Sequence, residues 1–500
     1  MKRISRRTVL RAAAAASAAF PLFTIGGTKA SGRVIGANDT IRIGVTGING
    51  RGGSHIDAFT GMDKVQLTYL IDVDSSLFDS RTQAVENRIG SRPKCVQDVR
   101  QALDDKSLDA ITVATTNHWH SLITIWACQA GKDVYVEKPI SHNVYEGRKC
   151  VEAAKKYNRV VQHGTQSRSD NKWAREIAAV HSGKYGDLLV SKGSASKGGS
   201  GRTSIGFKEI EKPPGTLDFN LWLGPAPEQP YHKNLVHYNW HWFWDTGNGE
   251  IGNQGVHQMD IARWGIKDGT LPTKVFSIGG RLLPDGPDQA ETPNMQLGVM
   301  EFGPTTLVFE VRGLVGKHKD WPNDVSNSFY TTEGVIKDEQ IVVNGKKVTV
   351  PFFYPKDGSK PQKLEVAGDV QVAPGGAFGS FINAIRTRNP EDCNCGVEVA
   401  HYSSALCHLP NISYRLGTQG TFDKARGSIG DDNKEAVATL ERIRDNCRAV
   451  GVPIDKTTYT IGPVLTFDPA NERFTGERAD EANKLLTREY RAPFVVPETV

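Results

Sequence analysis

The sequence predicts an α/β protein of two domains, a doubly wound parallel sheet followed by an α/β domain with a large, mostly antiparallel sheet. Three observations predict this fold class. Short apolar strands alternate with helical patterns between residues 39 and 165. A glycine-rich turn follows the first of these strands, and several strand patterns with no helices between them follow beyond residue 166. A chain of this length suits two domains with extensions.

The first thirty residues predict an export signal rather than a part of the fold. "MKRISRRTVLR" carries the twin arginine Arg6-Arg7, an apolar run follows at 12–23, and "TKA" at 28–30 has the small residues of a cleavage site. The run is shorter than the ~20 residues that span a bilayer. We therefore expect a periplasmic or otherwise exported chain that engages the twin-arginine (Tat) export machinery, with no membrane segment in the mature protein. An uncleaved or lipid-tethered N-terminus is the alternative.

The charge balance excludes an obvious nucleic-acid partner. The chain has 61 basic and 56 acidic residues, and six of the basic residues but none of the acidic ones lie in the leader. The remainder therefore carries 55 basic residues against 56 acidic ones. It has no basic excess with which to bind a phosphate backbone.

The cysteines predict no metal centre. Seven is an odd number, so not all of them can pair, and Cys393, Cys395 and Cys407 lack a fourth ligand at zinc spacing. We interpret them as buried or free thiols. One structural disulfide is the alternative in an exported protein.

The glycine-rich turn after the strand at 41–45 predicts a dinucleotide site. Its residues occupy the positions of a G-x-G-x-x-G fingerprint, with asparagine, which tolerates left-handed backbone angles, at the second. Such a turn lets backbone N–H groups and a helix N-terminus face a pyrophosphate. The candidate residues are Gly47, Ile48, Asn49, Gly50 and Gly52.

The carboxyl ends of the next strands supply further candidates. Asp72 ends the strand at 65–74, where an acid can bond the ribose hydroxyls and repel a 2′-phosphate, which favours NAD over NADP. The alternative for Asp72 is a turn or cap residue. Strands at 108–120 and 133–141 end in polar residues, and ligands of such sheets bind there. These residues are Thr115, Asn117, His120, Glu137 and Lys138.

Four motifs resemble the Gfo/Idh/MocA family, the glucose–fructose oxidoreductase and inositol dehydrogenase superfamily, in its exported, tryptophan-rich branch. They are the turn at 47–52, "ATTNHWH" at 114–120, "AGKDVYVEKPIS" at 130–141 and "GNQGVHQMD" at 252–260. The resemblance implies an NAD(P)-binding Rossmann domain at 39–165, a substrate-binding domain at 166–420 and an extension at 421–500. It also implies a homo-oligomer that forms through an open sheet face.

The second domain has strand patterns at 188–197, 274–283, 294–302 and 305–313, and a hairpin or insertion at 345–355. Helical patterns follow at 375–389 and 397–417, and Gly417 caps the second of them. The last eighty residues predict one charged helix, at 432–451, and then a loop-rich tail.

The stretch "EIGNQGVHQMDIARW" at 250–264 predicts a helix with four polar or aromatic residues on one face. Asn253, His257, Asp260 and Trp264 are spaced by four, three and four. The face is either that of a capped helix with a buried histidine or a catalytic face. The resemblance implies the second: His257 is the general acid/base, and Asn253 stands where the family has an aspartate. Asparagine can orient an imidazole but carries no charge. Asp260, one turn further on, is therefore expected to supply the missing carboxylate beside His257.

The resemblance also gives Lys138, in the Glu-Lys-Pro strand end, a place beside the nicotinamide. There its charge stabilises the reacting oxygen, and a cis Lys138–Pro139 bond fits the proline. Aromatic residues near the predicted catalytic helix favour a sugar pocket, although core packing is the alternative for each. The substrate candidates are Trp240, Trp242, Trp244, Gln166, Arg168 and Asp260.

Together these features predict an exported nicotinamide-dependent oxidoreductase that acts on the CH–OH group of a sugar, polyol or glycoside. Because no free nicotinamide pool is expected outside the cytoplasm, we expect tightly bound NAD that is regenerated within each cycle. A redox-neutral, NAD-dependent glycosidase or lyase is the second hypothesis. A non-catalytic sugar-binding protein that kept the fold is the third.

Overall fold

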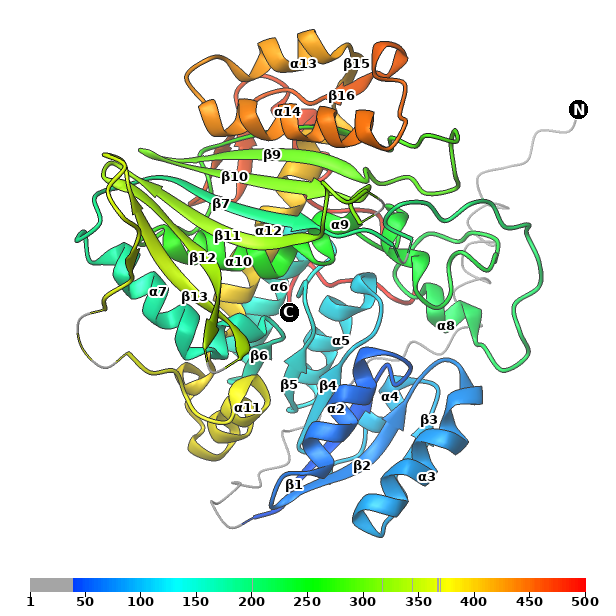
Figure 1. Ribbon diagram of the computed structural model, residues 1–500. Helices are drawn as coiled ribbons and strands as arrows, with labels where there is room; N and C mark the ends of the chain where they lie inside the picture. The colour runs from blue at the N-terminus through cyan, green and yellow to red at the C-terminus, as the bar shows by residue number, and fades with distance from the viewer. Residues whose placement is uncertain (1–38, 200, 317, 344, 367, 369) are drawn as a thin grey trace, which may run out of the picture.

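The structure is a computed structural model that describes residues 39–500 except 200, 317, 344, 367 and 369. The predicted export signal at 1–30 lies outside the described residues. Two sheets organise the chain, a smaller one at the base of Figure 1 and a larger one above it.

The smaller sheet has six parallel strands in the order β3-β2-β1-β4-β5-β6. The chain reverses its direction across the sheet between β1 and β4, which is where ligands bind to such sheets. This confirms the doubly wound fold class. The strands are β1 Ile41–Thr46, β2 Val65–Ile71, β3 Lys94–Val96, β4 Ala110–Val113, β5 Asp133–Val136 and β6 Val161–His163. The helices are α2 Arg51–Thr60, α3 Phe78–Ile89, α4 Val99–Leu103, α5 Asn117–Gln129 and α6 Val144–Lys156.

The larger sheet has twelve strands, with ten in the order β14-β13-β12-β11-β7-β10-β9-β8-β16-β15. Among the strand pairs described in this larger sheet only β10–β7 is parallel, so the sheet is mixed and mostly antiparallel, as predicted. The strands are β7 Leu188–Ser196, β8 Lys274–Gly280, β9 Met295–Phe302, β10 Thr305–Arg312, β11 Asp324–Thr331, β12 Gly334–Val343, β13 Lys346–Pro355, β14 Gln362–Lys363, β15 Thr418–Gly420, β16 Tyr459–Ile461, β17 Leu465–Asp468 and β18 Arg473–Thr475.

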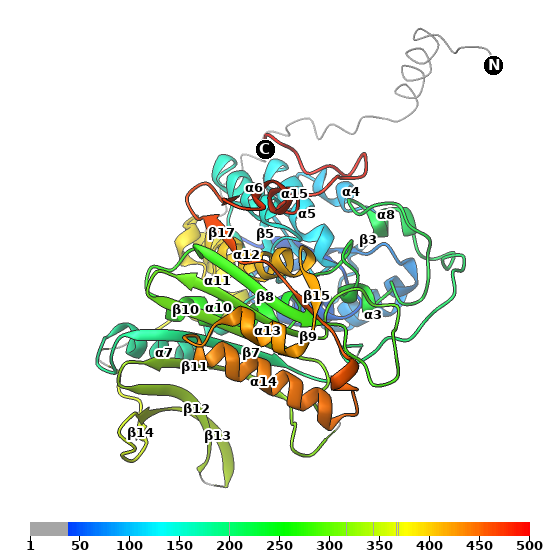
Figure 2. The ribbon, with the colours of Figure 1, turned by 90° about the horizontal axis from the view of Figure 1, so that it is seen from above.

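Helices cover both faces of the larger sheet. On the face toward the first domain lie α7 Asn171–His181, α10 Gly255–Gly265 and α12 Val397–Arg415. On the other face α14 Lys434–Ala449, beside α13 Phe422–Ile429, lies across β9 and β10 (Figure 2). The homo-oligomer implied by the resemblance stays a prediction. Because α14 covers β9 and β10, a contact between two copies through this face would use the other strands of the sheet.

Two parts of the chain return to the first domain. Helix α11, Gly376–Thr387, packs Phe381 and Ile385 on Ile41 and Ile43 of β1. Near the C-terminus, Phe494 joins the apolar cluster of the first domain. Beyond residue 451, in the tail that we expect to be loop-rich, the structure adds the short elements β16–β18 and α15 Ala479–Lys484, which the sequence does not predict. Strands of three or four residues are too short to show an alternating pattern.

A segment that we call the strap, residues 201–248, lies between β7 and the short helix α9 Gly249–Gly252. It contains α8 Phe219–Leu223 and runs along the right of Figure 1. The strap pairs with the chain after β2: Ser75 N donates to Thr216 O at 2.9 Å, and Asp218 N donates to Val73 O at 2.9 Å. A loop of the second domain is therefore fastened to the first.

All seven cysteines are free thiols in the structure, and six of them are buried. Within the described residues no group of three or more His, Cys, Asp or Glu side chains is arranged to hold a metal ion. In the same part of the chain no helix combines the length and the apolar character needed to cross a membrane.

Candidate active site

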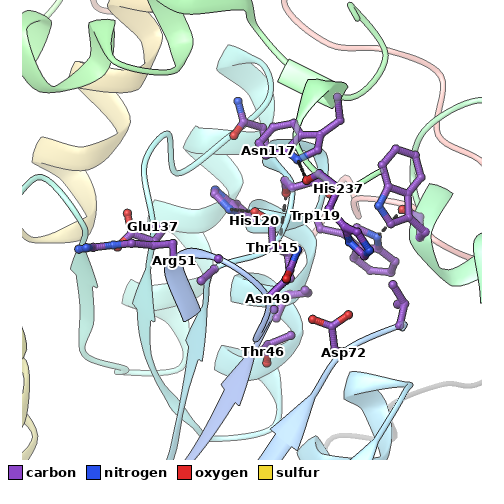
Figure 3. A pocket seen from close by; sticks show the side chains of 18 of the residues that line it. Thr46, Asn49, Arg51, Asp72, Thr115, Asn117, Trp119, His120, Glu137 and His237 are labelled. Carbon is purple, nitrogen blue, oxygen red and sulfur yellow. Dashed lines mark hydrogen bonds and ion pairs between the residues drawn. The ribbon is translucent and has the colours of Figure 1, made fainter. Parts of the chain in front are cut away.

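One cavity of about 470 Å³ lies between the two domains. Its wall combines the glycine turn, the carboxyl ends of β2, β4 and β5, the first turn of α5, the strap and the start of α10. Figure 3 shows Asp72 and His237 on one side of the glycine turn, and Arg51 with Glu137 on the other. The site-residue candidates on this wall are Gly47, Asn49, Gly50, Asp72, Thr115, Asn117, His120, Glu137, Lys138, Gln166, Trp240, Asn253 and His257.

The glycine turn fits a dinucleotide because two positions leave no room for a side chain. Gly47 has φ +81°, and a Cβ there would lie 2.5 Å from Ala114 O; a Cβ at Gly52 would lie 1.8 Å from Gly47 O. The left-handed angle belongs to Gly47, and Asn49 does not adopt one, contrary to our expectation. Helix α2 begins after Gly50 with no side-chain cap, so its first N–H groups are left for an anion. Gly52 and Ile48 shape the turn without lining the cavity.

Asp72 lies at the end of β2 and both holds the turn and faces the cavity. One carboxylate oxygen accepts from Ile48 N at 2.8 Å, and the other accepts from Asp74 N at 3.0 Å. Burial raises the pKa of Asp72. Beyond it Asp74 forms an ion pair with His237 of the strap, with 3.2 Å between Nε2 and Oδ2. The nucleotide end of the cavity is thus acidic and is covered by the strap.

The first turn of α5 brings Asn117 and His120 to the wall, since β4 ends at Val113 rather than at 120 as predicted. Asn117 Nδ2 donates to Asn248 Oδ1 at 3.0 Å, which joins the two domains. The His120 ring lies 2.6 Å from Pro139 O and 3.1 Å from Thr115 O. Both of its nitrogens thus contact backbone carbonyls, and the ring fixes the local backbone.

Glu137 follows β5 and is neutralised within the wall. It accepts from Arg51 Nε at 2.8 Å and lies 3.1 Å from His55 Nε2. Burial raises the pKa of Glu137, but the contacts with His55 and Arg51 outweigh burial and hold the pKa below its usual range. The next peptide bond, Lys138–Pro139, is cis, as expected from the motif.

Lys138 reaches across the cavity to the second domain. Its Nζ donates to Asn253 O at 2.9 Å and to Asn253 Oδ1 at 3.3 Å. Burial lowers the pKa of Lys138, while the carboxylates of Glu137 and Glu250 oppose that shift. An ammonium has three donors, so one N–H is left for a ligand in the cavity that Lys138 lines.

The helix expected across 250–264 is interrupted at Asn253. Helix α9 ends at Gly252, α10 begins at Gly255, and Asn253 between them has φ −94° and ψ −92°. His257 N therefore donates to Gln254 O at 3.2 Å, and the carbonyl of Asn253 is free for Lys138. Three glycines in seven residues, at 249, 252 and 255, are the sequence signal for this break.

His257 lines the cavity as an unpaired imidazole. Its ring makes no hydrogen bond to any residue that the structure describes. Burial lowers the pKa of His257 to about 3, and the charge of Lys138 adds to the effect. At neutral pH the ring is therefore uncharged and can accept a proton.

Asp260 does not take the place of the missing carboxylate. It is fully buried, forms an ion pair with Arg168 at 2.9 Å, and accepts from Ser403 Oγ at 2.6 Å. The Arg168 guanidinium lies 4.3 Å from the centre of the Trp264 ring. Asp260, Arg168 and Trp264 therefore form a structural cluster behind the cavity and do not line it, contrary to the expected catalytic face.

The three tryptophans separate in the structure. Trp240 lines the cavity, with its ring stacked on His241 at 3.6 Å between ring centres. Trp242 is 1% exposed and belongs to the core, and Trp244 lies near Tyr414, away from the cavity. Residues 239–242 form a 3-10 turn, so alternate positions do not share a face as they would in a strand.

Sequence reasoning missed the strap. It brings Leu221, Trp222, His237, Tyr238 and His241 to the cavity. Leu221 and Trp222 lie in the five-residue helix α8, and the others lie in or beside a 3-10 turn; elements this short have no periodicity from which their place could be predicted.

Two family models match the chain. The oxidoreductase family, NAD-binding Rossmann fold, matches residues 41–165. The C-terminal alpha/beta domain of the same oxidoreductase family, Gfo/Idh/MocA, matches residues 199–280.

Individual relatives are distant. A glycosyl hydrolase family 109 protein of Saccharopolyspora erythraea is 29% identical over 208 residues, 38% of this chain and 45% of that protein. The myo-inositol 2-dehydrogenase of Thermotoga maritima is 27% identical over 146 residues, 29% of this chain and 42% of that protein. The chain thus matches less than half the length of these curated relatives.

Solved structures share the fold. Levoglucosan dehydrogenase in its apo form has a TM-score of 0.51 and 15% identity, with 85% of this chain and 99% of that chain covered. Residues 41–165 and 199–280 of the fold described above thus match the two domains of one family, the Gfo/Idh/MocA family of NAD-binding oxidoreductases.

Proposed function

We propose that this protein is an exported NAD-dependent enzyme that oxidises a CH–OH group of a sugar, polyol or glycoside. The observation that carries the proposal is the single cavity that joins the glycine turn and Asp72 to Lys138 and His257. A dinucleotide seated on the turn would point its reactive end toward this lysine and histidine, as in other doubly wound folds.

The roles of the two residues follow from their charge. His257 lines the cavity with an unpaired ring that is uncharged at neutral pH, because burial lowers its pKa to about 3. Its position makes it the acceptor of the substrate hydroxyl proton, which is released as the hydride leaves. Lys138, held by Asn253, donates its remaining N–H to the same oxygen and stabilises the negative charge that develops there. A bound nicotinamide supplies the hydride acceptor.

The lining of the substrate end favours an uncharged, hydroxylated ligand. Trp240 presents an aromatic face, and Gln166 Nε2 is a buried donor that has no partner among the described residues. Arg51, the other basic side chain near this end, is already paired with Glu137. Sugars combine apolar C–H faces with many hydroxyl groups, and such a wall suits them.

Tight retention of NAD is part of the proposal. The strap covers the nucleotide end, and the C-terminal segment fastens the strap in turn, since Arg491 Nε donates to Gly224 O at 3.0 Å. Leu486 O accepts from Tyr145 N of the first domain at 3.0 Å. The carboxylate of Asp72, which lines that end of the cavity, disfavours the 2′-phosphate of NADP.

A redox-neutral glycosidase or lyase is the second candidate, and the curated relatives named as glycosyl hydrolase family 109 proteins favour it. Transient oxidation of a hydroxyl acidifies the neighbouring C–H bond, and the substituent one carbon further on can then leave. The same Lys138 and His257 serve this chemistry. The electrons return to the substrate, so a retained cofactor suffices outside the cytoplasm.

The deciding experiment measures the nucleotide and the products together. Mass spectrometry of the purified protein should find about one NAD per chain, and an empty protein with only micromolar NAD affinity would refute tight retention. Glycosides and free sugars are then incubated in D2O. A lactone or keto-sugar without deuterium on carbon indicates net oxidation. A released aglycone together with a sugar that carries deuterium on the carbon next to the transiently oxidised one indicates the redox-neutral route.

Variants separate catalysis from binding. Lys138→Ala and His257→Ala should each abolish turnover by either route, while Lys192→Ala, a buried lysine in the larger sheet, should retain it. Sugar binding without turnover in the wild type would indicate a binding protein instead. Export is tested separately: replacement of Arg6 and Arg7 by lysine should leave the protein in the cytoplasm.

A further inference from the structure

A chain of four side chains runs from the cavity into the second domain. Lys138 Nζ lies 3.3 Å from Asn253 Oδ1, Asn253 Nδ2 lies 3.0 Å from Glu250 Oε2, and Glu250 Oε1 lies 2.7 Å from Arg202 Nε. Asn253, Glu250 and Arg202 are all buried. Lys138 belongs to the proposed catalytic pair, whereas Glu250 and Arg202 have no part in the proposed reaction itself.

The charges at the two ends fix the orientation of the amide in the middle. Lys138 can only donate, so Asn253 must turn its oxygen toward the lysine. The amide nitrogen of Asn253 then needs an acceptor, and the Glu250 carboxylate provides one whichever of its two oxygens faces the amide. Arg202 holds Glu250 by a charge-assisted hydrogen bond. Lys138 is thereby tethered at both the backbone and the side chain of Asn253.

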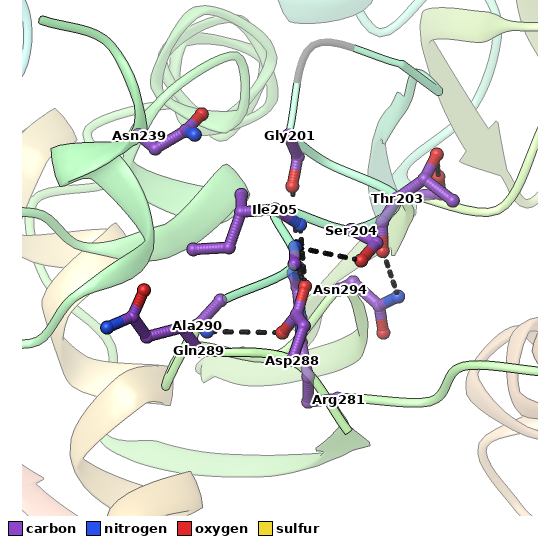
Figure 4. A network of polar contacts seen from close by, with 12 residues as sticks. Gly201, Thr203, Ser204, Ile205, Asn239, Arg281, Asp288, Gln289, Ala290 and Asn294 are labelled. Atoms are coloured by element: carbon purple, nitrogen blue, oxygen red, sulfur yellow. Dashed lines mark hydrogen bonds and ion pairs between the residues drawn. The ribbon is translucent and has the colours of Figure 1, made fainter. Parts of the chain in front are cut away.

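Arg202 is rigidly placed by its neighbours in the strap. Arg281 pairs with Asp288 at 2.7 Å and also donates to Gly201 O at 3.4 Å, and Asn294 Nδ2 lies 3.4 Å from Thr203 O (Figure 4). The residues on both sides of Arg202 are therefore fixed to the second domain. The Arg202 guanidinium is therefore a buried and fixed hydrogen-bond donor for Glu250, and not a mobile surface group.

We propose that Glu250 is the positioning residue of Lys138, and that it acts through Asn253. The proposal rests on the proposed function in taking Lys138 as the group that contacts the reacting oxygen. The carboxylate that the resemblance places at position 253 has in effect moved to position 250. It now orients the lysine through an amide, and His257 is left without a carboxylate partner.

The geometry makes carboxylates at 250 and 253 mutually exclusive. Two ionised carboxylates at the 3.0 Å that separates Glu250 Oε2 from Asn253 Nδ2 would repel each other. Glu250→Gln alone turns its oxygen to Arg202 and its NH2 group to Asn253, so Asn253 must turn its own NH2 group toward Lys138. Two donors then face each other, and the side-chain half of the tether is lost, while the bond from Lys138 to Asn253 O remains. Adding Asn253→Asp restores an acceptor both for Lys138 and for the new amide at position 250.

The first test needs no substrate. The full chain, as purified, is treated with acetic anhydride, and acetylation of Lys138 is followed by mass spectrometry. E250Q should label about five-fold faster than wild type, the factor expected for one lost hydrogen bond. The double variant E250Q/N253D should return to the wild-type rate. Equal labelling of E250Q and wild type, or a double variant no slower than E250Q, would overturn the proposal.

E310Q is the matched control, because Glu310 is also buried and also pairs with an arginine Nε at 2.7 Å, that of Arg312, outside the cavity. It should leave Lys138 labelling unchanged, and an increase equal to that in E250Q would indicate general loosening and overturn the proposal.

The second test uses turnover. E250Q should lower kcat about 10²-fold with little change in KM, since a misplaced catalytic group costs about that much, and E250Q/N253D should recover most of it. A loss in E250Q that appears only in KM contradicts the proposal. Absence of turnover in wild type and Lys138→Ala alike refutes the proposed function instead, and the labelling result is independent of it.

Discussion

The replacement Asp260→Asn tests whether this residue is structural, as its place behind the cavity indicates, or part of the catalytic face. Asp260 is fully buried and pairs with Arg168, whose side chain is 10% exposed. Removal of one partner from a buried ion pair costs about 3–5 kcal/mol, because the other charge is left unpaired. For the roughly 460 residues that the structure describes, the entropy of unfolding is about 1 kcal/mol per kelvin. The expected fall in Tm is therefore about 3–5 °C.

Calorimetry of wild type and variant, with kcat/KM measured well below Tm, gives the answer. We expect the fall in Tm with kcat/KM within about threefold of wild type, the change that remains when no transition-state contact is lost. Burial raises the pKa of Asp260, but Arg168 outweighs it and the net shift is downward. The ionised form therefore stabilises the fold above about pH 4, and the Tm difference should shrink as the pH falls below that. An unchanged Tm with a 10²-fold loss of kcat/KM would refute this placement. Asp431→Asn, which breaks an exposed pair with Arg426, should change neither quantity.

Three further outcomes are expected. Gly52→Ala should abolish NAD binding in calorimetric titration, because its Cβ would lie 1.8 Å from a carbonyl oxygen, whereas Gly53→Ala meets only the mobile end of a side chain at 3.4 Å and should bind normally. The acid limb of the kcat/KM profile should lie below pH 5, because the pKa of His257 is lowered to about 3; an acid limb near pH 6.5 would contradict the burial of the ring. Trp240→Ala should raise KM for the sugar and, because Trp240 is also buried, lower Tm, whereas Trp242→Ala, in the core, should lower Tm with little change in KM; an unchanged KM in Trp240→Ala would place the substrate elsewhere.

The sequence was sufficient for those parts of the site whose signals are local. A strand, a glycine turn and an acid about twenty residues on predict Gly47, Gly52 and Asp72 because each follows from its neighbours in the chain. Lys138 was found in the same way, since it follows the last buried residue of β5. These positions depend on one parallel sheet, and its pattern is strong.

The parts that failed depend on backbone geometry that spacing does not encode. Asp260 was assigned to the face of His257 on the assumption of one unbroken helix, but the break at Asn253 begins a new helix and Asp260 lies against Arg168. Glu250 and Arg202 could not be paired at all, because they are 48 positions apart and one lies in an irregular loop. Long-range contacts of this kind need the tertiary fold.

The break in the helix at Asn253 limits what a side-chain substitution at this position can remove. One of the two oxygens that hold Lys138 there belongs to the main chain. Side-chain substitution at 253 cannot delete it, so an alanine scan would underestimate the position. Chains with aspartate or asparagine here can share the same lysine anchor as long as the two helices part at this residue. What has to be preserved is an interruption of the backbone rather than the identity of a side chain.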